Sequence, residues 1–285
     1  MSNPASELSA RSALEITGLT LRISSAEILR GVNLSLAAGR IQGLAGESGS
    51  GKTMTGLAVL GLLPAGSQVT GSITYGGQEL LALPPRRRND LRGAEIAMVF
   101  QDPSTSLHPM LSVGAQLTDH LRHHLHLDRA ASRARAAELL GRVRIPDPAA
   151  ALRRYPHQFS GGQRQRIAIA IALACSPTVL IADEPTTALD VTVQAGVLHL
   201  LRDLATEMGL AVLLITHDLG VMSAVADRVA VMRHGEVVEN GDRLQVFTSP
   251  AHSYTASLLA SLPGAAGGVR TLDDVRALDI PSEQL

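Results

Sequence analysis

A glycine-rich segment at residues 46–53 constrains the fold of this chain more than any other feature. The segment consists of Gly46, Glu47, Ser48, Gly49, Ser50, Gly51, Lys52 and Thr53. It fits the phosphate-loop pattern of two glycines around four residues, followed by Lys and by Ser or Thr. An apolar run at 39–45 precedes it and another at 54–63 follows it, which predicts a loop between a buried strand and a helix.

Such a loop is an anion site, because its backbone N–H groups turn inward and the helix dipole places positive charge at the helix start. Lys52 is expected near the outer phosphates of a bound nucleotide, and the Thr53 hydroxyl is expected to be a magnesium ligand. The alternative is a surface turn rich in Gly and Ser that carries an incidental lysine.

Length and composition limit the other possibilities. The 285 residues suffice for one large α/β domain, or for a core with a smaller lobe. A formal net charge of −1 lacks the basic footprint of a nucleic-acid binder. The single cysteine, Cys175, excludes an internal disulfide and a cysteine-only metal site, and it favours a reducing, cytosolic compartment.

Neither the start of the chain nor its apolar stretches predict membrane insertion. Residues 1–12 are expected to form a flexible tail and lack the pattern of a signal peptide. The longest apolar stretches, 167–175 and 210–215, are far shorter than a membrane-spanning helix. We therefore expect the chain not to cross a membrane by itself.

Strand patterns occur on both sides of the phosphate loop. Residues 13–23 and 28–36 alternate apolar with polar side chains, which predicts an antiparallel layer beside the loop. Further predicted strands cover residues 72–75, 94–100, 179–182 and 211–215, with a hairpin-like pair at 228–232 and 235–239. The pattern favours an α/β fold with a parallel core sheet.

A largely helical stretch separates two of the predicted strands. Residues 113–174 follow a helical pattern with breaks near Pro146, Pro148 and Tyr155, so we expect a helical subdomain inserted at about 102–175. Its histidines, His120, His123, His124 and His126, have helical spacing that could hold a transition metal. A solvated helix face is favoured instead, because no carboxylate or thiolate stands in register to complete the site. The arginines at 86–88 receive no role, since a solvated loop or helix start explains them.

Polar side chains stand at the ends of three predicted strands. Gln101 follows one strand, Asp183 and Glu184 end another, and His217 follows a third. Parallel α/β sheets gather ligand groups beyond the carboxyl ends of their strands, so these side chains are expected to converge on residues 46–53. Asp183 would hold magnesium through its water shell, Glu184 would polarise the attacking water, and His217 would contact a terminal phosphate or that water. An exposed acidic turn is the alternative for Asp183 and Glu184.

A second glycine-rich loop precedes a second helix. Phe159, Ser160, Gly161, Gly162 and Gln163 stand before an apolar helical run, where another anion could bind. A short Gly/Ser turn is also common before helices, so this signal is weaker than the first. Asp190 begins the next helical stretch and could equally be an N-terminal cap.

Taken in their order along the chain, the loops and strand ends described above resemble the ATP-binding subunit of an ABC transporter. The resemblance covers nearly the whole chain. Residues 46–53 resemble its Walker A loop, 159–163 its signature loop, and 179–184 its Walker B strand. Gln101 matches its Q-loop, Ala188–Asp190 its D-loop, and His217 its switch histidine. The resemblance implies a P-loop NTPase core of ABC type, spanning about residues 13–250.

The resemblance also implies ligands and partners. ATP and Mg²⁺ would be sandwiched in a head-to-tail dimer, with Thr53, Gln101 and Asp183 near the metal. Ser160, Gly161 and Gly162 would face the γ-phosphate of the nucleotide bound by the partner, with Gln163 and Asp190 beside it. The chain would sit at the cytoplasmic face of the cell membrane on two transmembrane permease subunits, served by an extracytoplasmic substrate-binding protein. A soluble ABC protein acting on DNA or ribosomes is the remote alternative, and the chain lacks the heptads or tandem motifs of that class.

A finer resemblance is to the dipeptide, oligopeptide and nickel importer subfamily. It rests on residues 99–107, 155–162, 182–190 and the distal segment Pro250–Thr255 within the C-terminal part, 251–285. Import of di- or oligopeptides is the leading expectation, and nickel, a metal chelate or another small solute remains open. The working dimer could be homomeric or heteromeric.

Three positions depart from the family pattern. Ile23 stands where the family places an aromatic residue against adenine, so base stacking is expected to be weak. The subfamily's cysteine-rich iron–sulfur segment is excluded by the single cysteine. Phe159 replaces the first leucine of the signature loop, which we expect to be a tolerated apolar change.

Overall fold

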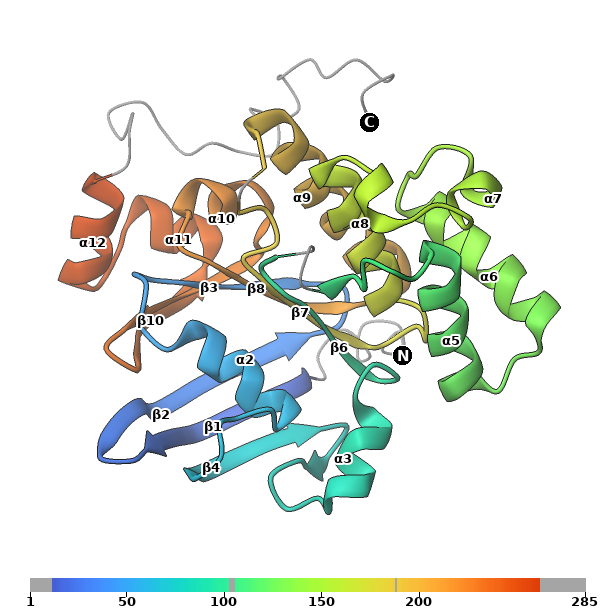
Figure 1. Ribbon diagram of the computed structural model, residues 1–285. Helices are drawn as coiled ribbons and strands as arrows, with labels where there is room; N and C mark the ends of the chain where they lie inside the picture. The colour runs from blue at the N-terminus through green and yellow to red at the C-terminus, as the bar shows by residue number, and fades with distance from the viewer. Residues whose placement is uncertain (1–11, 103–105, 188, 262–285) are drawn as a thin grey trace, which may run out of the picture. The chain divides into compact units, whose positions relative to one another are not determined.

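The computed structural model describes residues 12–102, 106–187 and 189–261. The chain forms two compact units (Figure 1). The described part of the first covers residues 12–89 and 202–261, and that of the second lies between residues 90 and 201. Each unit is described by itself below.

The core of the first unit is a sheet whose central strand leads into the phosphate loop. β3 (Ile41–Ala45) is buried along its whole length and pairs in parallel with β8 (Ala211–Thr216) and β9 (Arg228–Arg233). β10 (Glu236–Asp242) pairs with β9 in antiparallel orientation. Every residue of β3 and β8 is buried, as in strands covered on both faces. The predicted α/β class and the predicted hairpin are confirmed.

A second, antiparallel sheet completes the strands of this unit. β1 (Ser12–Ile23) lies between β2 (Ala26–Ala37) and β4 (Ser67–Tyr75), and β5 (Gln78–Glu79) pairs with β4 (Figure 1). The inward face of β1 changes parity between Ile16 and Leu19, because a register irregularity at Gly18 inserts a residue. The antiparallel layer predicted from alternation is therefore confirmed, with a bulge that the alternation did not reveal.

Short helices connect the strands of the first unit. The helices are α2 (Lys52–Leu60), α3 (Pro85–Leu91), α10 (Leu219–Val225), α11 (Arg243–Thr248) and α12 (Ser253–Ala260). The arginines at 86–88 lie in α3, so the helix-start alternative for them is correct. α9 (Val191–Met208) begins in the second unit and ends in the first.

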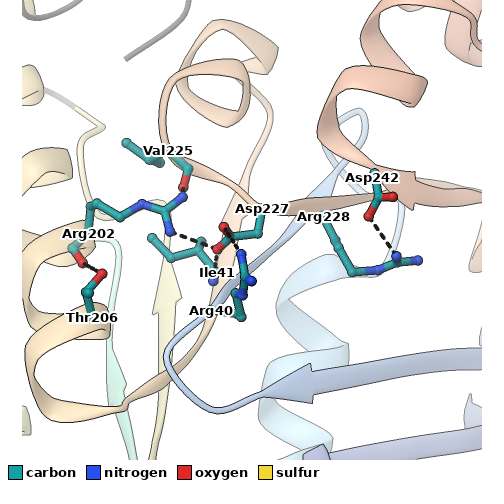
Figure 2. Close-up of polar contacts among 8 residues, drawn as sticks. All are labelled: Arg40, Ile41, Arg202, Thr206, Val225, Asp227, Arg228 and Asp242. Atoms are coloured by element: carbon teal, nitrogen blue, oxygen red, sulfur yellow. Dashed lines mark hydrogen bonds and ion pairs between the residues drawn. The ribbon is translucent and has the colours of Figure 1, made fainter. Parts of the chain in front are cut away.

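Asp227 ties three segments of the first unit together (Figure 2). Its carboxylate accepts hydrogen bonds from the Ile41 amide at 2.8 Å, from Arg202 at 2.8 Å and from Arg40 at 3.1 Å. Arg202 also donates to the Val225 carbonyl. Burial raises the pKa of Asp227, but the bonds from Ile41, Arg202 and Arg40 outweigh burial and hold the pKa below its ordinary value. The Asp227 carboxylate thus joins the start of β3, the C-terminal half of α9 and the start of β9.

Asp227→Asn should lower the free energy of unfolding by about 2–3 kcal/mol at pH 7, because a charged acceptor with three donors is lost. A lowered folded-state pKa contributes stability that is complete above the unfolded-state pKa of about 3.9 and is lost as pH falls through the folded-state pKa. The gap between wild type and variant should therefore narrow below about pH 4. Urea unfolding, followed by far-UV circular dichroism between pH 3 and 7, measures this.

Asp242→Asn is the matched control. Asp242 pairs with Arg228 at 3.0 Å, but its side chain is 75% exposed, so its loss should cost less than about 1 kcal/mol. Equal destabilisation by the two variants would contradict the central role of Asp227.

The second unit contains two parallel strands and a group of helices. β6 (Ile96–Val99) pairs with β7 (Val179–Asp183). The helices are α5 (Val113–Leu125), α6 (Arg129–Arg142), α7 (Pro148–Ala151), the 3₁₀ turn η2 (Pro156–Gln158) and α8 (Gly161–Ala172). They occupy the stretch for which the sequence predicts a helical insertion, 102–175, whose exact bounds stay a prediction.

Capping residues explain where three of these helices begin. Ser112 accepts from the Ala115 amide, Asp128 from the Ala131 amide, and Asp147 from the Ala150 amide. Leucines on the inner faces of α5 and α6 form the core of the group: Leu117, Leu121, Leu139 and Leu140. Within the described part of the chain, no helix combines the length and the apolar character that crossing a bilayer requires.

Candidate nucleotide-binding site

The phosphate loop has the backbone that its sequence predicts. Gly46, Gly49 and Gly51 have φ angles of 150°, 79° and 109°, which L side chains rarely adopt. α2 begins directly after the loop, at Lys52, and no side chain caps its first turn. The first amides of a helix have no partner within the helix, so this uncapped end can bind an anion.

Two glycines of the loop are also required by close packing. A Cβ atom at Gly46 would lie 2.2 Å from the Met232 carbonyl oxygen, and one at Gly51 would lie 2.7 Å from Leu29. The loop therefore lies directly against β2 and β9, and larger residues at these positions would displace it.

Lys52 and Ser50 fit a phosphate ligand. Lys52 is 6% exposed, and its ammonium donates to the carbonyls of Gly46 at 2.7 Å and Glu47 at 2.9 Å. These two bonds hold the cation over the loop. The Ser50 hydroxyl is buried and finds no hydrogen-bond partner among the described residues. A buried hydroxyl and a buried ammonium at an uncapped helix start suit an oxyanion.

Strand register brings His217 beside the phosphate loop. Ala45, the last residue of β3, pairs with Thr216, the last residue of β8. Gly46 and His217 are the next residues of the two strands, so both leave the sheet at the same edge. His217 is exposed there. The expected convergence of this histidine on the loop is consistent with the register in the first unit.

Strand register likewise brings Gln101 near the two carboxylates, Asp183 and Glu184, in the second unit. Val99 of β6 pairs with Ala182 of β7, so Gln101 and Asp183–Glu184 follow neighbouring strand ends. Asp183 is 5% exposed and Gln101 is exposed. The alternative of an exposed acidic turn does not fit Asp183, whereas Glu184 is only half-buried.

Glu184 is held in an unusual conformation. Its φ of 48° lies in the left-handed region, which a residue other than glycine rarely occupies. Its carboxylate accepts a hydrogen bond from the Thr187 hydroxyl at 2.9 Å. No role was predicted for Thr187, although a hydroxyl three residues after a carboxylate, beyond a proline, is a turn signal that could have identified it.

The signature loop forms the capped start of α8. The Ser160 hydroxyl accepts from the Gln163 amide, and the Gln163 side chain accepts from the Ser160 amide, so the two residues make a capping box. A Cβ at Gly162 would lie 2.2 Å from Val193, which brings the loop against the start of α9. Phe159 is 4% exposed beneath the Arg154 guanidinium, which agrees with an apolar requirement at this position.

Asp190 acts as a helix cap in this structure. Its carboxylate accepts from the Val193 amide at 3.0 Å, at the start of α9. The capping alternative is therefore correct, and a role of Asp190 toward nucleotide stays a prediction. Ala188, also assigned to the D-loop, lies outside the described residues.

The histidines of α5 do not form a metal site. The His120 and His124 rings meet edge to face at 4.7 Å, and burial, as the largest cause, lowers the pKa of both. Throughout the described ranges, no group of three or more His, Cys, Asp or Glu side chains is placed to hold a metal ion. We therefore give these histidines no role in ligand binding.

Comparison with known proteins shows the family to which the chain is related. A family profile described as ABC transporter matches residues 29–187. The oligopeptide transport ATP-binding protein OppD of Bacillus subtilis is 48% identical over 239 residues, which cover 83% of this chain and 67% of that protein. A putative peptide import ATP-binding protein of Brucella abortus is 52% identical over 233 residues, covering 81% of this chain and 70% of that protein.

Solved structures show the same fold. CbiO1 of Clostridium perfringens, part of an ABC transporter complex, superposes with a TM-score of 0.74 at 26% identity and covers 94% of this chain and 99% of its own. An ATP-binding cassette in a dimeric post-hydrolysis state, bound to ADP and phosphate, superposes with a TM-score of 0.70 at 28% identity. That match covers 81% of this chain and 98% of the cassette.

Proposed function

The chain belongs to the ABC transporter family, and we propose that it is the ATP-hydrolysing subunit of an importer for di- or oligopeptides. The observation that carries the proposal is the uncapped phosphate loop with its buried Lys52. The names of relatives at 48–52% identity support the peptide cargo. Import of nickel, a metal chelate or another small solute is the second candidate, because the subfamily that the chain resembles includes nickel importers.

The phosphate loop would bind the polyphosphate of ATP. The amides of residues 46–53 and the Lys52 ammonium would contact the phosphate oxygens. Thr53, Gln101 and Asp183 would hold Mg²⁺, which neutralises charge on the β- and γ-phosphates when bound. Because Asp183 is nearly buried at the end of β7, its carboxylate is fixed in direction.

Glu184 would act on the water that attacks the γ-phosphate. Its carboxylate would accept a proton from that water or orient it, and Thr187 would fix the carboxylate in direction. His217 would donate a hydrogen bond to the γ-phosphate, and Gln101 would help to orient the water.

Two copies of the cassette would be needed for a complete site. The signature loop, Ser160–Gln163, would face the nucleotide held by the partner's phosphate loop, with Asp190 beside it. The capping box uses the amides of Ser160 and Gln163, which leaves those of Gly161 and Gly162 to meet that phosphate. Two transmembrane permease subunits would hold the dimer at the cytoplasmic face of the membrane, and a substrate-binding protein would deliver the cargo.

Adenine would be held more loosely than the phosphates. Ile23 at the end of β1 offers an apolar contact in place of an aromatic ring, so stacking is weaker. Discrimination among purine nucleotides is therefore expected to be low.

The first experiment is magnesium-dependent ATP hydrolysis by the purified chain, alone and mixed with a second ABC ATPase subunit from the same organism. We expect the rate to rise with the square of protein concentration at low concentration, because each site needs two cassettes. Activity of the chain alone would identify a homodimer, and activity only on mixing would identify a heterodimer. A rate linear in protein concentration, or no hydrolysis in either sample, would contradict the proposal.

Uptake distinguishes the cargo. In proteoliposomes that contain the permease subunits, this chain and the binding protein, ATP should drive accumulation of labelled di- or oligopeptide. Accumulation of nickel or a chelate without peptide uptake would select the second candidate.

A further inference from the structure

The distal segment Pro250–Thr255 has no role in the site described above, yet the structure fixes it firmly. Glu239 of β10 accepts hydrogen bonds from the amides of Ala251 at 2.8 Å and His252 at 3.1 Å. The His252 ring nitrogen Nδ1 in turn accepts from the Tyr254 amide at 3.1 Å. The β9–β10 hairpin therefore sets the position at which α12 begins and the direction of its first side chains.

The Tyr254 ring is enclosed by the same hairpin. The Arg233 guanidinium, at the end of β9, lies 4.6 Å from the centre of the ring, and the side chain is 9% exposed. A cation over a desolvated aromatic face is attractive, so the ring has little freedom to turn away. Tyr254 is thus held by packing that does not depend on its hydroxyl.

The hairpin that holds Tyr254 also supports the phosphate loop. The Gly235 amide donates to the Ser50 carbonyl at 2.9 Å. The Met232 carbonyl lies so close to Gly46 that no Cβ would fit between them. The phosphate loop and α12 therefore rest on the same hairpin.

The Tyr254 hydroxyl is buried and has no hydrogen-bond partner of good geometry among the described residues. Glu47, the second residue of the phosphate loop, faces it with both its amide and its carboxylate. Burial raises the pKa of the Tyr254 phenol, and the Glu47 carboxylate adds to that increase, while the Glu47 amide opposes it. A buried hydroxyl without a well-aligned hydrogen bond is costly, so its position beside Glu47 calls for an explanation.

We propose that Tyr254 is a positioning residue whose hydroxyl bonds to Glu47 when the phosphate loop closes on a nucleotide. In this structure, the Lys52 ammonium holds the Glu47 carbonyl at 2.9 Å. Phosphates attract that ammonium, which frees the Glu47 peptide to shift by a small amount toward the hydroxyl beside it. The distal segment thereby favours the nucleotide-bound form of the loop. The inference rests on the proposed function, since it requires nucleotide binding.

Tyr254→Phe isolates the hydroxyl, because the ring and its contact with Arg233 remain. We expect the dissociation constant for MgATP, measured with a fluorescent ATP analogue and by competition with ATP, to rise about three- to tenfold. The thermal midpoint measured without added nucleotide should not fall, because the variant loses a hydroxyl that makes no well-aligned hydrogen bond in this structure. Turnover at saturating MgATP should stay within about twofold, since Tyr254 does not contact the attacking water.

Tyr75→Phe is the matched control, because Tyr75 lies in β4 of the antiparallel sheet. Its affinity for MgATP should remain within about twofold of wild type. Equal MgATP affinity of Tyr254→Phe and wild type would overturn the inference, and so would a loss of affinity that comes only with a lower thermal midpoint of the nucleotide-free variant. Failure of the unaltered chain to bind MgATP would instead overturn the proposed function, and the inference with it.

Discussion

Glu184→Gln should reduce steady-state ATP hydrolysis at least about 100-fold while nucleotide binding is retained. Glutamine has the shape of glutamate but cannot accept the proton of the attacking water. Its side-chain oxygen can still accept from the Thr187 hydroxyl, so the position of the side chain should be kept. Phosphate release measures turnover, and size-exclusion chromatography with MgATP should show a dimer that persists because its nucleotide is not consumed.

Glu138→Gln is the control in the same unit. Glu138 lies on α6, is paired with Arg135 and Arg142, and is half exposed. Its replacement should leave turnover within about twofold. Appreciable steady-state hydrolysis by Glu184→Gln would assign proton acceptance to another group, and His217, at the end of β8, would be the next to test.

Lys52→Ala should weaken MgATP binding about 100-fold or more, because a buried ammonium contributes charge-assisted bonds to several phosphate oxygens. Lys52→Arg should not restore binding. The lysine side chain is 6% exposed within a loop closed by its own carbonyls, where a planar guanidinium does not fit. Titration with a fluorescent nucleotide measures both variants.

Circular dichroism and thermal unfolding without nucleotide separate lost binding from lost folding. Each variant also removes the bonds from Lys52 to the carbonyls of Gly46 and Glu47. A modest decrease of the thermal midpoint is therefore compatible with the prediction. Affinity for MgATP close to that of wild type in Lys52→Ala would contradict the assignment of the phosphate loop.

The sequence predicted those parts of the fold that short, continuous patterns encode. β3, β7 and β8 were predicted to within about two residues, because apolar runs of this length are typical of strands buried on both faces. α2 begins at Lys52, two residues before the apolar run that starts at Met54, because the left-handed Gly51 is the N-cap of the helix. The short helices α10 and α11 were missed, because one or two turns carry too few apolar positions to show a period.

Contacts between distant residues could not be predicted from such patterns. Asp227 accepts a hydrogen bond from the Ile41 amide, 186 positions away, and no local pattern around either residue predicts this contact. Glu184 was predicted from its place at a strand end, but its left-handed backbone and its bond to Thr187 depend on the turn that follows. Asp190 fitted a cap and a nucleotide contact equally well, because a carboxylate before a helix suits both.

Lys52 is the only lysine among the 285 residues, and arginine carries every other permanent positive side-chain charge. Apart from the terminal amine, acylating and arylating reagents that attack neutral amines therefore have a single target, the ammonium that holds the carbonyls of Gly46 and Glu47. Any surface immobilisation or amine-directed dye coupling that goes beyond the terminal amine would modify the phosphate loop itself. Such preparations would need chemistry directed at another group, and the extent of labelling at Lys52 would report on how often the loop opens.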